Sequence, residues 1–182
     1  MTGNPRQTTT GAESTTDAID PGSLADESGV DYCETTFTHE GADHCEAGAV
    51  GRAIVGMTDS EGEVLLCVRA GGDHAILPNG IVDGDGEWRD AAREAVETLG
   101  VAVETEGIER VRRIDHERED GTHLETTHHV VFRGTHPDGG SERDEPSIAC
   151  DDEWTARWVA DSPVDLDREG DSVAEDIRLF LD

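Results

Sequence analysis

Electrostatic repulsion is the strongest constraint on how this chain folds. Its 182 residues carry 43 acidic side chains against 14 basic ones, a formal net charge of -29, and all 14 are arginine. Such repulsion opposes compaction in dilute buffer, but at molar salt the Debye length falls to about 3 Å and the charges are screened. The composition therefore predicts a halophilic protein from a salt-rich cytosol.

The same charge excludes several classes of partner. Nucleic-acid backbones and anionic membranes are bound through clustered basic side chains, which this sequence lacks. No run approaches the ~18 apolar residues of a membrane span, and the N-terminus lacks the basic and apolar regions of a signal peptide. We therefore expect a cytoplasmic protein. If its substrate carries phosphates, divalent cations are the natural bridge between that substrate and the acidic chain.

Composition divides the chain into three regions. Residues 1–31 are rich in Thr, Ser, Gly and acidic residues with few large apolar side chains, which predicts a disordered tail. Residues 32–49 form a lead-in segment, and residues 50–182 carry the apolar periodicity of a folded domain.

The lead-in segment contains four side chains of the types that bind zinc, namely Cys33, His39, His44 and Cys45. Their spacing matches none of the common zinc patterns, so a plain strand and loop is the favoured interpretation, with a small zinc-stabilised module as the alternative. Cys67 and Cys150 add no CxxC spacing, and in a reducing cytosol all four cysteines are expected to be free thiols.

Strand patterns occupy most of the third region. The β-rich runs Val50–Thr58 and Val64–Val68 flank a polar turn and predict a hairpin. A short apolar piece, Ala75–Leu77, is expected to end at Pro78 in a loop rich in Gly and Asp. Further on, the pattern predicts a second hairpin with strands Ile108–His116 and Thr127–Arg133, a polar loop over Gly134–Asp152, a strand at Thr155–Ala160 and a closing helix over Ser172–Leu181.

The clearest helix is expected over Glu87–Leu99, with Asp85 as its N-cap and Gly100 as its stop. One side is apolar, and Asp90, Glu94 and Glu97 fall on the opposite side. Glu94 and Glu97 are three residues apart, so their carboxylates share a face and can bind one hard cation such as Mg²⁺. Arg93 and Glu97 are four apart and can pair.

The stretch from Leu77 to Val101, LPNGIVDGDGEWRDAAREAVETLGV, resembles the Nudix box, whose pattern is G-x(5)-E-x(7)-R-E-U-x-E-E-x-G-U with U a bulky aliphatic residue. The second half matches best, through Arg93, Glu94, Glu97, Gly100 and Val101. The LPNG and GE pairs also look like the family's LPGG and GE, and Trp158-Val159 ahead of Ser162-Pro163 resembles a late strand of the family.

The resemblance implies an α/β fold, a Nudix-like α/β/α sandwich with a mixed β-sheet between helices. It also implies hydrolysis of a nucleoside diphosphate linked to another moiety, with Mg²⁺ or Mn²⁺ as cofactor and a small nucleotide as substrate. Glu94 and Glu97 would be catalytic metal ligands, the backbone carbonyl near Asn79 or Gly80 a further ligand, and Arg93 the residue that orients the carboxylates.

The box also departs from the family pattern. Thr98 stands where the family has a second consecutive Glu, Ala95 where it has a bulky aliphatic residue, and Asn79 where LPGG has glycine. Gly80 to Glu87 is one residue too long, and Glu87 to Arg93 two too short. These departures keep a second reading open, a Nudix-fold protein that has lost turnover and binds a nucleotide or a protein partner.

Several questions stay open in the sequence. His123, His128 and His129, with His116 nearby, could line the cleft, although histidines on a sheet face in water are the favoured interpretation. Trp158 is expected in the core, and Trp154 is left open. The residues that recognise the substrate are not identified, and pairing into a homodimer is neither predicted nor excluded.

Overall fold

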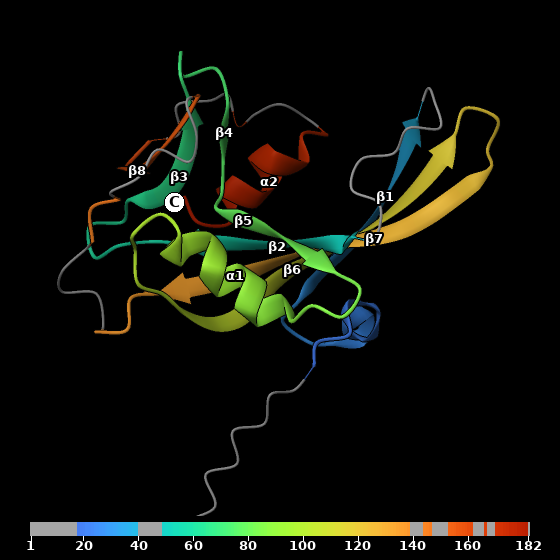
Figure 1. The fold of residues 1–182 in the computed structure, drawn as a ribbon, viewed down its shortest axis with the longest axis horizontal. Helices are drawn as coiled ribbons and strands as arrows, with labels where there is room; N and C mark the ends of the chain where they lie inside the picture. The colour runs from blue at the N-terminus through green and yellow to red at the C-terminus, as the bar shows by residue number, and fades with distance from the viewer. Residues whose placement is uncertain are drawn as a thin grey trace, which may run out of the picture.

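The computed structural model of the protein describes residues 18–39, 49–138, 144–146, 153–161, 166 and 170–181. It is a mixed α/β structure in which two sheets are combined with short helices (Figure 1). In chain order the elements are η1 (Pro21–Asp26), β1 (Asp31–His39), β2 (Ala49–Met57), β3 (Val64–Arg69), β4 (Ala75–Ile76), β5 (Asn79–Asp83), α1 (Trp88–Glu97), β6 (Glu104–Arg118), β7 (His123–Thr135), β8 (Trp154–Val159) and α2 (Ser172–Arg178).

The larger sheet has the strand order β1-β6-β7-β2-β5 and is mixed. β1 runs parallel to β6 and β2 runs parallel to β7, whereas the β6–β7 and β2–β5 pairs are antiparallel. The smaller sheet is antiparallel, with the order β4-β3-β8. The predicted α/β class with a mixed sheet is therefore confirmed.

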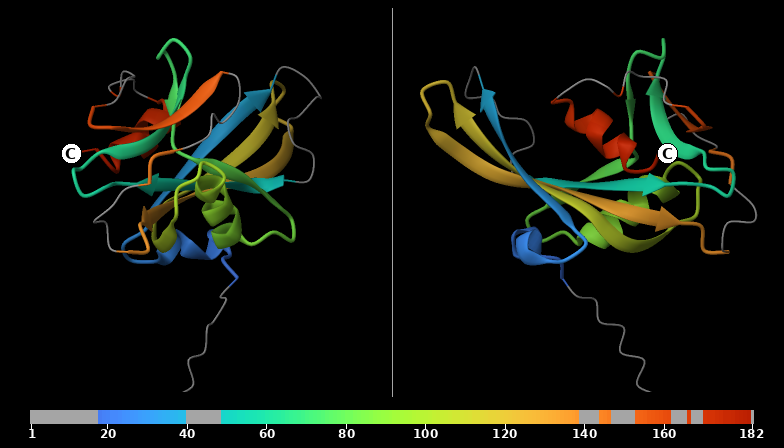
Figure 2. Two further views of the ribbon diagram at one scale, coloured as in Figure 1. Left: turned by 60° about the vertical axis from the view of Figure 1, so that its left-hand side comes forward. Right: turned by 180° about the vertical axis from the view of Figure 1, so that it is seen from behind.

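Alternation along β2 divides the core between the two faces of the larger sheet. Ala53 and Val55 belong to the cluster that contains Trp88, Ala92 and Val96 of α1. Ile54, between them, belongs to the cluster that contains Ile177 of α2 and the following Phe180. Since successive strand residues point to opposite faces, the two helices cover opposite faces of the sheet (Figure 2).

The first predicted hairpin is wrong in its pairing. Both strands form, as β2 and β3, but they lie in different sheets and share only the bridge between Thr58 and Val64 within the described chain. From Val64 to Val68 β3 is buried at every position, so it needs cover on both faces. Both core clusters supply that cover: Leu65 packs in the cluster that contains α1, and Leu66 packs in the cluster that contains α2. In its sheet β3 pairs with β8, which is far along the chain, and the local turn signal does not encode that pairing.

The loop expected after Pro78 is also wrong, because Asn79–Asp83 forms β5 at the edge of the larger sheet. Gly80 makes this possible: a Cβ atom there would lie 2.9 Å from the carbonyl oxygen of Ala91. The absence of a side chain therefore allows β5 to approach α1 closely while it pairs with β2.

The folded part begins earlier than the boundaries predicted at residues 31 and 50. Asp20 caps η1 by accepting a hydrogen bond from the backbone N–H of Gly22, and Ile19, Leu24 and Val30 pack against the core beneath α1. β1, placed in the lead-in segment by composition, is one of the two edge strands of the larger sheet. Residues 1–17 of the predicted tail lie outside the described residues.

The remaining elements follow the expected order with shifted ends. The second hairpin forms as β6 and β7 and is longer than predicted, so that Gly134 and Thr135 of the expected loop belong to a strand. α1 begins at Trp88 after Glu87, not after an Asp85 cap, and Gly100 follows it with φ of 81°. Within the described residues, no helix is long and apolar enough to cross a lipid bilayer.

Candidate functional site

The candidate site lies around α1, a helix whose orientation is determined by burial of its one apolar side. Trp88, Ala92 and Val96 are buried against the sheet, so the side chains of Asp90, Glu94 and Glu97 are exposed. The helix lies beside the edge strand β5, close to Gly80. This contact brings the segment around Gly80 and the acidic helix together.

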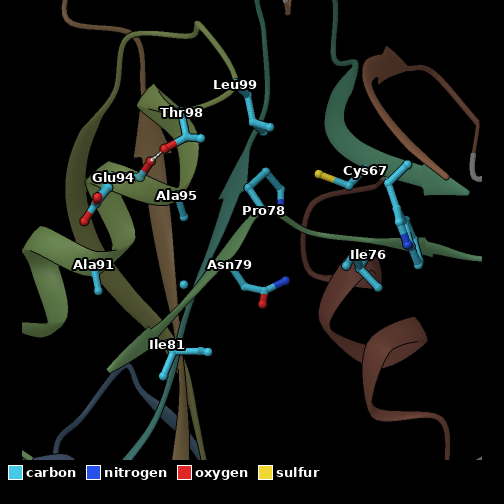
Figure 3. Close-up of a pocket in the computed structure, with 12 residues that line it drawn as sticks. Cys67, Ile76, Pro78, Asn79, Ile81, Ala91, Glu94, Ala95, Thr98 and Leu99 are labelled. Carbon is cyan, nitrogen blue, oxygen red and sulfur yellow. Dashed lines mark hydrogen bonds between the residues drawn. The ribbon is translucent and has the colours of Figure 1, made fainter. Parts of the chain in front are cut away.

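A pocket of about 480 Å³ opens between α1, β5 and the smaller sheet (Figure 3). In Figure 3, Ala91 and Ala95 face β5 from the helix, while Cys67 and Ile76 form the opposite side. The lining comprises Cys67, Ile76, Pro78, Asn79, Gly80, Ile81, Ala91, Glu94, Ala95, Thr98, Leu99 and Trp154. The pocket thus has a largely apolar wall with a carboxylate, an amide and a hydroxyl.

Glu94 and Gly80, two of the predicted site residues, both line this pocket. The backbone carbonyl of Glu94 accepts hydrogen bonds from the Thr98 hydroxyl at 2.7 Å and the Thr98 backbone N–H at 2.9 Å. In Figure 3 the Glu94 carboxylate extends from the helix on the side away from Asn79 and Cys67. Glu94 is therefore a rim residue in this conformation.

Glu97 and Arg93, the other two predicted residues, are not among the described residues that line the pocket. Arg93 donates a hydrogen bond to Asp90 at 2.8 Å, and its Nε lies 3.8 Å from a carboxylate oxygen of Glu97. The predicted Arg93–Glu97 pair thus exists, but Asp90 holds the shorter contact. The structure places Gly80 in the lining of the pocket and Glu94 at its rim, and leaves Glu97 and Arg93 on the adjoining exposed face.

Asn79 has a role that its position in the box did not suggest. Its Oδ1 accepts a hydrogen bond from Arg52 at 2.8 Å, and its Nδ2 donates to the carbonyl of Leu77 at 3.0 Å. Arg52 comes from β2, the strand next to β5. An arginine inside the apolar run of β2 was the sequence signal that could have identified this contact.

The apolar wall was also missed, because its residues come from distant parts of the chain. Cys67 comes from β3, Ile76 from β4 and Trp154 from β8. Trp154, left open by the sequence, lines the pocket and packs against the core. Trp158 also packs against the core as predicted, and its indole N–H donates to the carbonyl of Asp144 at 3.0 Å.

The histidines of the second hairpin are not all on a water-facing surface. His123 is exposed, but burial lowers the pKa of His128, and burial followed by the charge of Arg112 lowers the pKa of His129 to about 4. His116 bonds His39 of β1 at 2.9 Å and Thr127 at 2.8 Å. The expectation of solvated histidines is therefore wrong for His129.

The structure excludes a single zinc ion bound by all four residues of the alternative interpretation, Cys33, His39, His44 and Cys45. Cys33 and His39 lie six residues apart on the extended strand β1, a separation of about 20 Å at ~3.3 Å per residue, so one ion cannot contact both. His44 and Cys45 lie outside the described residues. Among the described residues, Cys33 and Cys67 form no disulfide, and Cys45 and Cys150 fall outside the described chain.

A different acidic cluster lies in the turn between β2 and β3. Carboxylate oxygens of Asp59, Glu61 and Glu63 lie within 4.8 Å of one another. Asp59 organises the turn, since its Oδ1 accepts hydrogen bonds from the backbone N–H groups of Glu61 and Glu63 at 2.9 Å. These bonds account for the cluster as a turn motif.

Comparisons with known proteins assign no family. No protein-family model matches the chain, and no curated protein matches it. Among solved structures, the solution structure of the E. coli ORF135 protein is 15% identical over 83% of this chain and 87% of that chain, with a TM-score of 0.37.

Proposed function

We propose that this protein hydrolyses a nucleoside diphosphate linked to another moiety, with Mg²⁺ or Mn²⁺ as cofactor, on a Nudix-like α/β/α sandwich. One observation carries the proposal: Glu94, at the place of a box carboxylate, stands at the rim of the pocket of about 480 Å³ that Asn79 and Gly80 also line. Helices on opposite faces of a mixed sheet support the sandwich.

The donor set of the rim fits a hard divalent cation. Glu94 and Glu97 are exposed and one helical turn apart, and side chains at this spacing are neighbours. Mg²⁺ takes one or two carboxylates together with substrate phosphates and water, so two glutamates suffice if the substrate completes the shell. When bound, the cation would offset charge on the phosphate oxygens and favour ionisation of the attacking water.

The other residues of the proposal have distinct tasks. The backbone of Gly80 lies close to α1, so we assign its carbonyl as a backbone ligand, and Arg93, 3.8 Å from Glu97, as the residue that orients the Glu97 carboxylate. Trp154, Ile76 and Cys67 offer an apolar wall against which a base or another planar group can pack. Recognition of the substrate is thereby separated from the acidic rim.

A second candidate function is nucleotide binding without turnover. Glu97 and Arg93 lie outside the pocket lining, and Thr98, in the place of a second carboxylate, uses its hydroxyl to bond the Glu94 carbonyl. A metal site with fewer carboxylates binds its cation more weakly, and this is the observation that supports the second candidate. The pocket itself serves either function.

Phosphate release in molar KCl separates the two candidates. The purified chain is incubated with Mg²⁺ or Mn²⁺ and ADP-ribose, dinucleoside polyphosphates, NADH or nucleoside triphosphates, and release is measured after phosphatase coupling. We expect metal-dependent turnover that Glu94→Gln and Glu97→Gln each lower by about 100-fold or more, on the scale of losing a group that stabilises transition-state charge. Glu104→Gln, an exposed glutamate outside the pocket, is the matched control.

Each outcome has one meaning. Turnover that both box variants retain would overturn the assignment of these glutamates. Calorimetric nucleotide binding without phosphate release from the wild type would support the second candidate. If no nucleotide in the panel either binds or reacts, the nucleotide substrate class is wrong.

A further inference from the structure

Asn79 places a side-chain amide in the pocket, and the proposed function does not use it. The residue is half-buried on β5 and lines the pocket next to α1. Two hydrogen bonds, one with Arg52 and one with Leu77, hold its oxygen and its nitrogen. These two neighbours therefore determine what the amide presents to a ligand.

The neighbours permit only one orientation of the amide. Arginine has N–H donors and no acceptor, so Arg52 bonds the oxygen, which lies 2.8 Å from its Nη1. The backbone carbonyl of Leu77 is only an acceptor, and it lies 3.0 Å from the amide nitrogen. Rotating the amide by half a turn would set its N–H groups against the guanidinium and its oxygen against the carbonyl, so both bonds would be lost.

The amide nitrogen keeps one hydrogen for a ligand. It carries two, and Leu77 accepts one of them. Within the described part of the chain, the side chain of Asn79 forms no further hydrogen bond. In Figure 3 the amide nitrogen points away from β5, toward the side of the pocket that Cys67 and Ile76 form. The second N–H is therefore available to a group that lies against this side.

The amide oxygen, in contrast, is a poor partner for a ligand. The half-buried guanidinium of Arg52 lies beside it, so a donor group of a ligand would meet other donors and a positive charge there. Hydrogen bonds in a chain also polarise one another, so the bond from Arg52 strengthens the remaining N–H as a donor. Asn79 thus favours acceptor groups over donor groups.

The acceptor that fits this place is a ring carbonyl rather than a phosphate. The Glu94 carboxylate extends from α1 on the side away from Asn79, so metal and phosphates held by the acidic rim lie apart from the amide (Figure 3). The planar group of the substrate is then the part that reaches the wall of Cys67, Ile76 and Trp154. A phosphate at that wall would bring its charge against apolar side chains, which is costly.

We propose that Arg52 is a positioning residue that fixes the amide of Asn79 as a hydrogen-bond donor, so that the pocket selects a nucleotide whose ring presents a carbonyl oxygen rather than an amino group. The nucleotide class itself rests on the proposed function. Arg52 comes from β2 and is not among the described residues that line the pocket, so its effect on the ligand passes through Asn79.

The side-chain amides allow a direct test, because the chain has only two asparagines, Asn4 and Asn79, and one glutamine, Gln7. The full chain, labelled with ¹⁵N, is titrated in molar KCl without divalent metal with inosine or with adenosine, which carry a carbonyl and an amino group, respectively, at the same ring position. The Asn79 signals are those that Asn79→Gly lacks. We expect inosine to shift them and to bind about 10-fold more tightly than adenosine.

Variants of Arg52 separate positioning from a merely structural role. Arg52→Leu removes the donor that holds the Asn79 oxygen, so the preference for inosine should disappear, whereas Arg52→Lys keeps a cationic donor and should retain it. Asn79→Gly should also lack the preference, and adding Arg52→Leu to it should change nothing further, because the two residues act as one unit. Arg118→Leu changes an exposed arginine outside the pocket and is the matched control. Urea unfolding checks that all variants are folded.

The nucleosides also separate this inference from the proposed hydrolysis. Equal affinity for inosine and adenosine, or Asn79 signals that neither nucleoside moves, would overturn it and leave the Arg52–Asn79 bond as a contact that only joins β2 to β5. Signals that move with inorganic pyrophosphate and Mg²⁺ but not with inosine would show that the acceptor is a phosphate, which overturns the carbonyl assignment. Phosphate release without a preference for inosine would leave the hydrolysis standing, whereas the preference without phosphate release from any nucleotide would reject the hydrolysis alone.

Discussion

The two helices of this protein use acidic side chains in opposite ways. On α1, Asp90, Glu94 and Glu97 all project from the exposed face. On α2, Asp176 is 4% exposed and accepts hydrogen bonds of 3.0 and 2.9 Å from Arg112, which is itself 3% exposed. The buried carboxylate of Asp176 anchors α2 to the sheet through Arg112, whereas the exposed carboxylates of α1 stay accessible to cations.

The anchor under α2 has a second arginine. Arg110 donates to Asp176 at 3.0 Å and to Asp31 at 2.8 Å, so α2 is joined to both β6 and the start of β1. Burial on its own would lower the pKa of Arg112, but its hydrogen bonds and charge interaction with Asp176 outweigh burial and raise the pKa above its ordinary value. Arg112 is therefore charged in the folded protein.

Removing the buried carboxylate should give the largest loss of stability. In Asp176→Ala the guanidinium of Arg112 stays buried without its main counter-charge, which typically costs about 3–5 kcal/mol. We expect that loss in the free energy of unfolding, measured with urea in molar KCl. Glu175→Gln, on the same helix but 39% exposed and 3.4 Å from Arg112, should cost less than about 1 kcal/mol. Equal effects of the two variants would contradict the contrast.

Acid should weaken the α2 side of the sheet through His129. This residue pairs with Arg112 in the β6–β7 register, and burial first, then the charge of Arg112, lowers its pKa from 6.5 to about 4. The unfolded chain takes up a proton near pH 6.5 and the folded chain only near pH 4, so stability falls as the pH drops between these values. At about 1.4 kcal/mol per pH unit, the loss approaches about 3 kcal/mol.

The measurement is urea unfolding at several pH values between 7 and 4 for the wild type and His129→Gln. The variant should lack this part of the acid-induced loss, although ionised carboxylates contribute their own. His123→Gln changes an exposed histidine of the same strand and should follow the wild type. A His129→Gln profile parallel to that of the wild type would mean that His129 does not oppose acid unfolding.

The sequence predicts α1 but not the contact between Asp176 of α2 and Arg112, because the first depends on local pattern and the second on the fold. The periodicity that buries Trp88, Ala92 and Val96 is local, and so is the choice of Gly100 at the helix end. The contact between Arg112 and Asp176 spans 64 positions. Neither residue differs in type from the many exposed acidic and basic residues of the chain, so only the fold identifies them.

The same distinction holds within the candidate site. Glu94 and Gly80 could be placed together from the order of residues in the box, because a short loop joins β5 to α1. The wall formed by Cys67, Ile76 and Trp154 depends on a smaller sheet whose strands pair across the chain. Because the sequence analysis paired β2 with β3 in a hairpin, it did not predict the smaller sheet or the pocket wall that this sheet provides.

The contact between β5 and α1 should be intermediate in strength. In Gly80→Ala the new Cβ would lie 2.9 Å from the Ala91 carbonyl oxygen, a backbone atom, so the helix must shift. Overpacking of this kind typically costs about 1–3 kcal/mol. Gly107→Ala is the control, because nothing lies within 4 Å of its added Cβ. Urea unfolding of both variants measures the difference, and a cost equal to that of Gly107→Ala would show that β5 and α1 are not closely packed.

The exposed face of α1 should contribute least to folding. Asp90 and Arg93 are 63% and 51% exposed and lie 2.8 Å apart, and surface pairs three residues apart on a helix typically contribute about 0.2–0.5 kcal/mol, less at high salt. Asp90→Asn should therefore lower the free energy of unfolding by no more than that in dilute salt and by nothing measurable in molar KCl. A loss above about 1 kcal/mol in molar KCl would mean that the Asp90–Arg93 pair stabilises the fold, as the Asp176–Arg112 pair of α2 is expected to do. A negligible loss would mean that folding does not require the Asp90–Arg93 pair, as expected of a helix face whose side chains are free to meet cations.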